Sequence, residues 1–214
     1  MLRIGHRGAK GYVAENTFKS IKKAIQLNVD GIEIDVFKCL SGQLVLSHDA
    51  DLERMTGKSG AIENLTLEEL DDYLINKEYK ICTLNEILEK IKDPLLINIE
   101  LKGSDTATTT SEIINDFLVK GTWNIEDFIV SSFDWFKLEK FRFFEKDIPV
   151  GILVSKSMSI NEAIKFAKKI DAQAIHPNYE LLNEKTIRKI KNNGFKVYTW
   201  TVNDKDKIEY MKKL

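Results

Sequence analysis

The sequence predicts an α/β protein with a parallel sheet, because short apolar segments alternate along the chain with segments of helical periodicity. The apolar segments are rich in Ile, Leu and Val, as strands buried on both faces of a parallel sheet are. The chain has 214 residues, which is enough for one sizeable core, and a single α/β barrel commonly fills about this length. We therefore expect a single domain over residues 1–214.

Seven segments are predicted as strands of this sheet. They are residues 2–5, 31–37, 95–102, 128–132, 150–154, 172–176 and 196–201. A further short strand, residues 43–48, follows the second so closely that only a hairpin through Ser41 and Gly42 can join them.

The helices between these strands are predicted from their ends as well as their periodicity. Three Ser or Thr residues stand three positions before a Glu, which is the capping-box pattern, and two glycines follow helical segments as C-terminal caps. These are Thr66 with Glu69, Thr83 with Glu86, Ser159 with Glu162, Gly121 and Gly194.

The segment after the second strand departs from the alternation. Residues 51–80 are polar and have little strand pattern, and the hairpin precedes them directly. Residues 38–80 are therefore predicted to form a hairpin-plus-cap insertion over the site.

Acidic residues interrupt two of the apolar strands near their carboxyl ends, where ligand sites of parallel α/β folds lie. Glu33 and Asp35 are two residues apart and project to one face, and Glu100 and Lys102 repeat this arrangement on the next strand. Two carboxylates among apolar neighbours repel each other and lose hydration unless a cation compensates. A hard divalent cation is the simplest compensator, since all the ligands would be oxygens.

Composition excludes several classes of protein. The formal net charge is −1, so neither nucleic acid nor a stable membrane association is expected. Cys39 and Cys82 are too few and too unpatterned for a disulfide framework or a zinc site, and they fit a reducing compartment. No signal peptide or membrane span is recognisable, so we expect a cytoplasmic protein.

Seven short motifs occur in an order that closely resembles the glycerophosphodiester phosphodiesterase family, over nearly the whole chain. They are His6-Arg7-Gly8, Glu15-Asn16-Thr17, Glu33-Ile34-Asp35-Val36, His48-Asp49, Glu100-Leu101-Lys102, Ser131-Ser132-Phe133 and Trp200-Thr201-Val202-Asn203. The resemblance implies a TIM (β/α)8-type barrel with a small insertion after the second strand. It also implies metal-dependent hydrolysis of glycerophosphodiesters to sn-glycerol 3-phosphate and an alcohol, a reaction of lipid and glycerol metabolism.

The resemblance implies a role for each matched residue. Glu33, Asp35 and Glu100 would bind a divalent metal, Mg²⁺ or Ca²⁺, and His6 with His48 would be the general acid and base. The remaining roles are phosphate binding by Arg7 and Lys102, a glycerol-pocket wall formed by Trp200, and support of the site by Glu15 and Asn16. His176 lacks an acidic partner and is expected at a strand end or pocket rim, outside the catalytic set.

The chain departs from the family at two places. Ala14 stands where members usually have proline, which is expected to soften the loop without removing a reacting group. The sequence also ends at Leu214, inside the helix that family members follow with a last strand, so that strand is expected to be missing.

The chemistry agrees with these groups, because an anionic phosphodiester needs its charge neutralised and its leaving alkoxide protonated. Two alternatives stay open: a lysophospholipase D-like phosphodiesterase, and a non-catalytic barrel that binds a phosphate ligand. The head-group alcohol, the metal, the assignment of acid and base, attack by water or by the glycerol 2-hydroxyl, and the oligomeric state are also open.

Overall fold

The computed structural model describes residues 1–214 as two compact units, residues 2–128 and residues 129–214, the latter with Met1. Each is described by itself below. None of the helices combines the length and the apolar character needed to cross a lipid bilayer.

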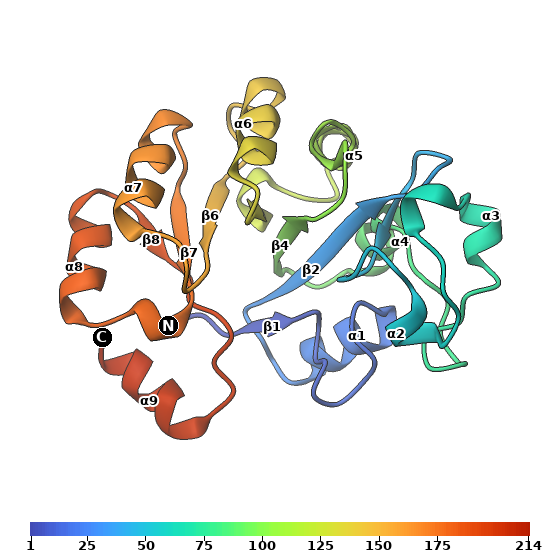
Figure 1. Ribbon diagram of the computed structural model, residues 1–214, viewed down its shortest axis with the longest axis horizontal. Helices are drawn as coiled ribbons and strands as arrows, with labels where there is room; N and C mark the ends of the chain where they lie inside the picture. Colours follow the sequence, from blue (N-terminus) through green and yellow to red (C-terminus); the bar gives the residue numbers. More distant parts are fainter. The chain divides into compact units, whose positions relative to one another are not determined.

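The N-terminal unit is built on three parallel strands in the order β1-β2-β4 (Figure 1). They are β1 (Ile4–His6), β2 (Gly31–Lys38) and β4 (Leu96–Leu101). The antiparallel strand β3 (Leu44–Leu46) pairs with the end of β2 and completes the predicted hairpin. Ile32, Ile34 and Val36 of β2 are fully buried, which is the apolar face that the alternation predicts.

The helices of this unit start where the sequence predicts them. Thr66 and Thr83 both form complete capping boxes, and Gly121 lies just past α5 with a positive φ of 66°. The helical elements are α1 (Phe18–Gln26), α2 (Glu53–Thr56), η1 (Ile62–Asn64), α3 (Leu67–Leu70), α4 (Leu84–Lys90), α5 (Thr106–Val119) and η2 (Ile125–Asp127).

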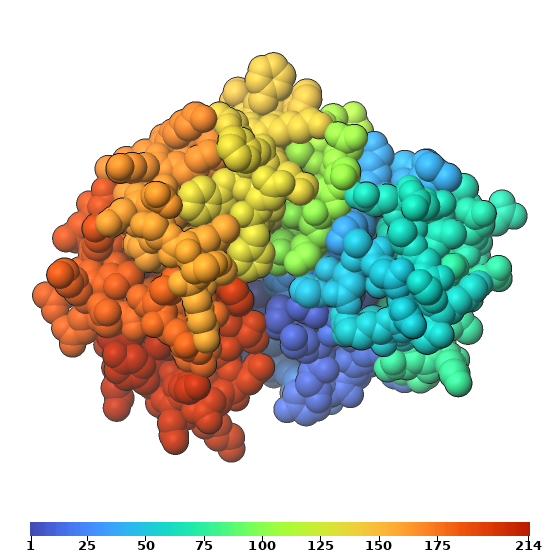
Figure 2. Space-filling view, in the orientation of Figure 1, coloured from blue at the N-terminus to red at the C-terminus, as the bar shows by residue number.

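The cap, residues 38–80, supplies most of an apolar cluster that also includes Phe37 of β2 and Ile81. Leu52, Ile62 and Leu70 are each at most 2% exposed and pack with Val45 of the hairpin. In the space-filling view its cyan to blue-green atoms form one continuous surface (Figure 2). The cap is therefore a packed element that can hold a side chain in a fixed place.

The C-terminal unit repeats the βα pattern, with the strand order β5-β6-β7-β8 and parallel pairing from β5 to β8. Its strands are β5 (Phe128–Ser132), β6 (Val150–Val154), β7 (Ala174–Pro177) and β8 (Lys196–Val197). Its helical elements are α6 (Trp135–Phe144), α7 (Ile160–Lys169), η3 (Tyr179–Leu181), α8 (Glu184–Asn192) and α9 (Lys205–Lys213). Ser159 caps α7 by accepting a hydrogen bond from the Glu162 N–H.

All seven predicted strands are present, and β7 begins two residues later than predicted and includes Pro177. β1 begins later than predicted and includes His6, while β8 covers only two residues of the predicted 196–201 segment. Beyond β8 the chain stays beside the end of β7: the Thr199 side chain donates from Oγ1 to the Pro177 carbonyl, and Trp200 pairs as a single parallel bridge with Asn178. The predicted α/β class is confirmed.

Candidate functional site

Polar side chains form two rows across β1, β2 and β4. The register sets His6 beside Glu33 and Glu33 beside Asn98, and two positions further along it sets Asp35 beside Glu100. Paired positions of parallel strands share a face, and so do residues two apart. The strand geometry alone therefore gathers these five side chains on one face.

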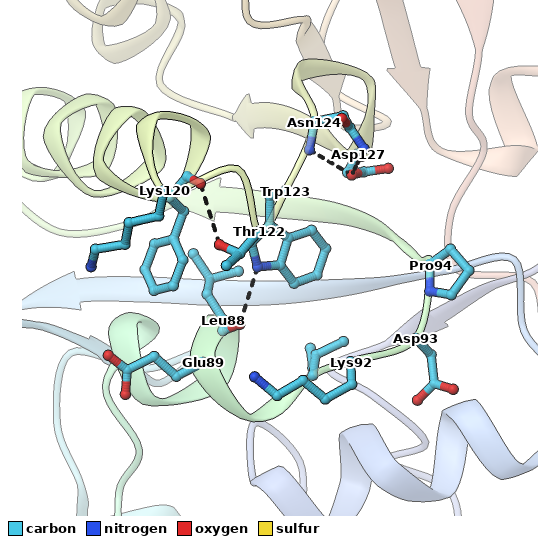
Figure 3. A pocket seen from close by; sticks show the side chains of 12 residues that line it. Leu88, Glu89, Lys92, Asp93, Pro94, Lys120, Thr122, Trp123, Asn124 and Asp127 are labelled. Carbon is cyan, nitrogen blue, oxygen red and sulfur yellow. Dashed lines mark hydrogen bonds between the residues drawn. The ribbon is translucent and has the colours of Figure 1, made fainter.

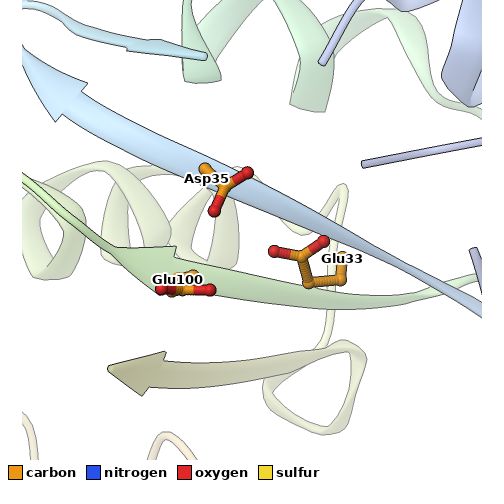
Figure 4. A group of neighbouring side chains, drawn as sticks. All are labelled: Glu33, Asp35 and Glu100. Atoms are coloured by element: carbon orange, nitrogen blue, oxygen red, sulfur yellow. The ribbon is translucent and has the colours of Figure 1, made fainter. Parts of the chain in front are cut away.

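Glu33, Asp35 and Glu100 form a compact acidic cluster. Carboxylate oxygens of the three lie within 4.8 Å of one another, and Figure 4 shows those of β2 turned toward that of β4. The residues are 8%, 0% and 8% exposed. Burial, and then the charges of Asp35 and Glu100, raise the pKa of Glu33 well above its usual value. Burial followed by the charge of Asp35 likewise raises the pKa of Glu100 to about 7.

These raised pKa values show that the cluster is short of positive charge. Glu33 Oε1, Asp35 Oδ1 and the nearby Asn98 Oδ1 are buried without a hydrogen-bond donor. Three unsatisfied acceptors in one place are costly unless a cation or donors reach them. An all-oxygen set fits a hard divalent cation such as Mg²⁺ or Ca²⁺, so the residues present fit the predicted metal.

The first βα loop holds its backbone in an unusual conformation at the site. Arg7 and Asn16 both have positive φ, 53° and 56°. The Arg7 N–H donates to Glu33 Oε2 at 2.9 Å, and the Asn16 side chain donates to Asp35 Oδ2 at 2.9 Å. Gly8, with φ 76°, lies so close to α1 that a Cβ there would be 2.6 Å from Ser20 Oγ. The loop thus ties itself to both acids of β2.

Two cations flank the acidic cluster. Arg7 lies with Nη1 2.8 Å from Glu15 Oε1 and Nε 3.3 Å from Asp35 Oδ2, and its side chain is 11% exposed. Lys102 Nζ is 3.0 Å from Glu100 Oε1 and 3.8 Å from Asp35 Oδ1. Both predicted phosphate-binding residues therefore lie beside the predicted metal ligands.

His6 lies at the end of β1 with Nε2 3.8 Å from Glu33 Oε2. Burial, and then the charges of Lys10 and Arg7, lower the pKa of His6 to about 3. The imidazole is therefore neutral near pH 7 in the metal-free protein.

His48 reaches the same unit by the hairpin. The N–H of Ser47 donates to the Asp35 carbonyl at 3.1 Å, which fixes the chain just before His48 beside β2. His48 Nδ1 is 2.6 Å from Asp49 Oδ1. Burial alone would raise the pKa of Asp49, but hydrogen bonds from Arg54 and His48 outweigh it and lower that pKa. The ring thus has a charged carboxylate on one nitrogen, which leaves Nε2 for other partners.

Nine of the ten predicted site residues belong to the N-terminal unit, and the tenth, Trp200, belongs to the C-terminal unit. Trp200 Nε1 donates to the His176 carbonyl at 2.8 Å, and its ring meets Phe133 edge-on. His176 is 3% exposed, with Nε2 buried and without a partner, and lies against Gly151. Of the two positions predicted for His176, the structure has the strand end, in β7, and not a pocket rim, because the ring is buried in the core.

Three residues of the site are absent from the predicted set: Asn98, Asp49 and Arg54. The two-residue alternation predicts Asn98 on the same face as Glu100, but assigns it no role. Asp49 follows His48 directly, a common position for a histidine partner. Arg54 lies in the segment without a recognisable pattern, and only the folded chain shows its contacts.

A cavity of about 440 Å³ lies in the N-terminal unit apart from the residues of the acidic cluster (Figure 3). Its lining includes Leu88, Lys92, Lys120 and Trp123, with the Trp123 indole donating to the Leu88 carbonyl at 3.1 Å. It contains no histidine and none of the clustered acids. The acidic cluster and His6 lie at the strand ends instead.

Comparison with known proteins gives a consistent result. Residues 6–214 match the sequence profile of the "Glycerophosphoryl diester phosphodiesterase family". A "Glycerophosphodiester phosphodiesterase" of Caldanaerobacter subterraneus is 32% identical over 98% of this chain and 89% of its own.

Solved structures agree with this similarity. A glycerophosphodiester phosphodiesterase from Thermotoga maritima is 29% identical, with a TM-score of 0.80 over 100% of this chain and 91% of that one. An Oleispira antarctica phosphodiesterase, solved in complex with the product sn-glycerol-3-phosphate, is 28% identical, with a TM-score of 0.87 over 98% and 88%. The predicted TIM-barrel-type fold with an insertion after the second strand is confirmed.

Proposed function

The chain belongs to the glycerophosphoryl diester phosphodiesterase family, and we propose that it hydrolyses glycerophosphodiesters to sn-glycerol 3-phosphate and an alcohol by metal-dependent acid–base catalysis. One observation carries this proposal: three buried carboxylates, two of them with an unsatisfied oxygen, lie beside His6 and two cations. The product named for the Oleispira relative supports the same substrate class.

Glu33, Asp35 and Glu100 would hold the divalent cation. The connected site has two more negative than positive charges when all its groups are ionised. The carboxylates are Glu15, Glu33, Asp35, Asp49 and Glu100, and the cations are Arg7, Arg54 and Lys102. A bound Mg²⁺ or Ca²⁺ would balance that charge and polarise a phosphoryl oxygen of the substrate.

Arg7 and Lys102 would bind the phosphate. The Arg7 guanidinium can contact two oxygens at once, whereas the Lys102 ammonium acts as a point charge. Glu15 and Asn16 orient this part of the site, since Glu15 accepts from Arg7 and Asn16 donates to Asp35.

We assign the two proton transfers from the surroundings of the histidines. His6 ends β1 beside Glu33 of the predicted metal site, and we assign it as the base that would accept a proton from the attacking hydroxyl or water. Asp49 Oδ1 lies 2.6 Å from His48 Nδ1 and orients the ring, so His48 would donate from Nε2 to the leaving alkoxide oxygen.

Several predictions stay predictions. They are a single catalytic domain over residues 1–214 with residues 38–80 as its insertion, a glycerol-pocket wall at Trp200, and a cytoplasmic location. The lysophospholipase D-like activity and the non-catalytic binder are outcomes of the experiment below.

The experiment incubates the purified chain with glycerophosphocholine, glycerophosphoethanolamine or lysophosphatidylcholine, with Mg²⁺, Ca²⁺ or excess EDTA, and identifies both products by mass. We expect sn-glycerol 3-phosphate from the first two substrates, and loss of turnover in EDTA that added metal restores. Undiminished turnover in EDTA would contradict the metal, lysophosphatidic acid as the main product would favour the lysophospholipase, and binding without products would favour the binder.

A further inference from the structure

Arg54, on the short helix α2 of the cap, contacts two carboxylates of the site. Its Nε donates to Asp49 Oδ2, and its Nη2 lies 2.6 Å from Glu15 Oε1. Its side chain is 49% exposed, so it is not buried for packing. One guanidinium thus joins a residue that follows the hairpin to a residue of the first βα loop.

Each of these carboxylates holds a further group in place. Asp49 uses its other oxygen, Oδ1, to reach His48 Nδ1 at 2.6 Å. Glu15 Oε1 also accepts a hydrogen bond from Arg7 Nη1 at 2.8 Å. Arg54 is therefore one residue removed from the proposed general acid on one side and from the proposed phosphate-binding arginine on the other.

We propose that Arg54 is a positioning residue through which the cap sets the direction of the His48 ring and of the Arg7 side chain. The inference rests on the proposed function, because these directions matter for turnover only if His48 and Arg7 act on a phosphodiester. The hydrogen bonds of Arg54 go to Asp49, Glu15 and Met55, and not to the three clustered acids or to His48.

The chemistry of arginine suits this task. The planar guanidinium directs donors at two acceptors in a fixed geometry, whereas a lysine ammonium is a flexible point charge. Without a cation between them, Asp49 and Glu15 would repel each other and each would lose a hydrogen bond. Asp49 would then be free to turn, and His48 would lose the partner that fixes which ring nitrogen carries the proton.

The cap is packed well enough to hold Arg54 where it is. Leu52, two residues before it, is 2% exposed in the cap core, and Met55, directly after it, packs against the same core. The cavity between this turn, His48 and Glu15 is only about 10 Å³, which leaves room for about one water. The position of Arg54 therefore follows the position of the cap core.

The first test is kinetic and compares Arg54→Met, Arg54→Lys and the control Arg188→Met. Arg188 is 73% exposed and pairs only with Glu184 on its own helix among its described contacts. We expect Arg54→Met to lower kcat by roughly 10- to 100-fold with KM changed by no more than about threefold, since misplacing a reacting group by about 1 Å has an effect of that size. Arg54→Lys should recover part of the loss, and Arg188→Met should behave as the natural chain.

The second test does not need turnover. The ¹⁵N chemical shifts of the His48 ring report which nitrogen carries the proton in the neutral form, with His6 and His176 as references. We expect Nδ1–H in the natural chain and in Arg188→Met, and a mixture with Nε2–H in Arg54→Met. The double variant Asp49→Asn/Arg54→Met completes a mutant cycle. Its fold-loss in kcat should be smaller than the product of the fold-losses of the two single variants, because both substitutions break the same contact.

The outcomes separate the two proposals. If the natural chain hydrolyses no glycerophosphodiester, the proposed function fails, while the ring shifts still decide the role of Arg54. Unchanged kcat together with an unchanged His48 tautomer in Arg54→Met would overturn the positioning role. A loss of kcat that multiplies fully with Asp49→Asn would overturn it as well, because Arg54 would then act independently of Asp49.

Discussion

The two units share a βα architecture but differ in what their strands carry. In residues 2–128 the strands β2 and β4 bury Glu33, Asp35 and Glu100 together, whereas the buried polar side chains of β5 and β7 include Ser131 and His176. The first arrangement buries charge and forms the proposed metal site, and the second mainly packs. Burial of a polar group is therefore not by itself a sign of function; the difference lies in charge and in neighbours.

Two histidines make this contrast concrete. Burial lowers the pKa of both His6 and His176 to about 3. Charged groups surround His6, including Glu33 at 3.8 Å, while His176 lies against Gly151 and the ring of Tyr198. The same pKa direction thus accompanies a proposed catalytic group in one unit and a core residue in the other.

The largest expected effect on kcat comes from replacing each histidine by glutamine. His6→Gln and His48→Gln should each lower kcat by roughly 10²- to 10⁴-fold, because each removes a proton-transfer group. His176→Gln is the matched control and should keep kcat within about threefold, measured as release of sn-glycerol 3-phosphate. A loss in His176→Gln as large as in the other two would remove the contrast between the units.

A second test asks whether the acidic cluster opposes folding while it supports activity. Glu33→Gln should abolish metal binding in calorimetry and lower turnover by roughly 100-fold, since it removes a ligand. In EDTA the same variant should melt at a higher temperature than the natural chain, because a buried repulsion is gone. A lower melting temperature in EDTA would mean that Glu33 stabilises the metal-free fold.

The pH dependence of stability sharpens the comparison further. Glu100 has a folded-state pKa of about 7 against its usual 4.5, so the folded state binds more protons between these values. The metal-free chain should therefore lose on the order of 1–3 kcal/mol of unfolding free energy as pH rises from about 4.5 to about 7. Denaturation in EDTA across this range measures it.

The controls for that slope lie in the same chain. Glu100→Gln should reduce the fall with pH and leave the part due to Glu33, whereas Glu184→Gln, at a side chain that is 72% exposed, should leave the fall unchanged. Saturating Mg²⁺ should also flatten it, since a bound cation favours the charged carboxylates. A slope that persists undiminished in Glu100→Gln would assign the effect to other groups.

The smallest expected effect on kcat comes from a substitution in the C-terminal unit. A Cβ at Gly151 would lie 2.2 Å from His176 Nε2, so Gly151→Ala should destabilise the chain by about 1–3 kcal/mol as overpacking does. Its kcat should stay near that of the natural chain, measured below the melting temperature. Gly121→Ala, where the added Cβ meets open space but φ is positive, separates steric from backbone effects.

Strand periodicity was sufficient to predict much of this site. The spacing of Glu33, Asp35 and Glu100 predicts a shared face because strand side chains alternate, and the hairpin after β2 follows from the short distance along the chain. The role of Arg54 could not be predicted this way. It depends on where the cap core places one helical turn, and the contacts of that turn span 39 residues to Glu15.

The hairpin has a consequence for how such an enzyme can diversify. His6 ends a strand of the parallel scaffold, whereas His48 follows the antiparallel β3 and is joined to the cap. The spacing of the proposed proton donor and acceptor is thus set partly by the insertion after β2. Changes of length there would offer natural variation a way to suit bulkier or smaller leaving groups while the scaffold strands keep their sequence.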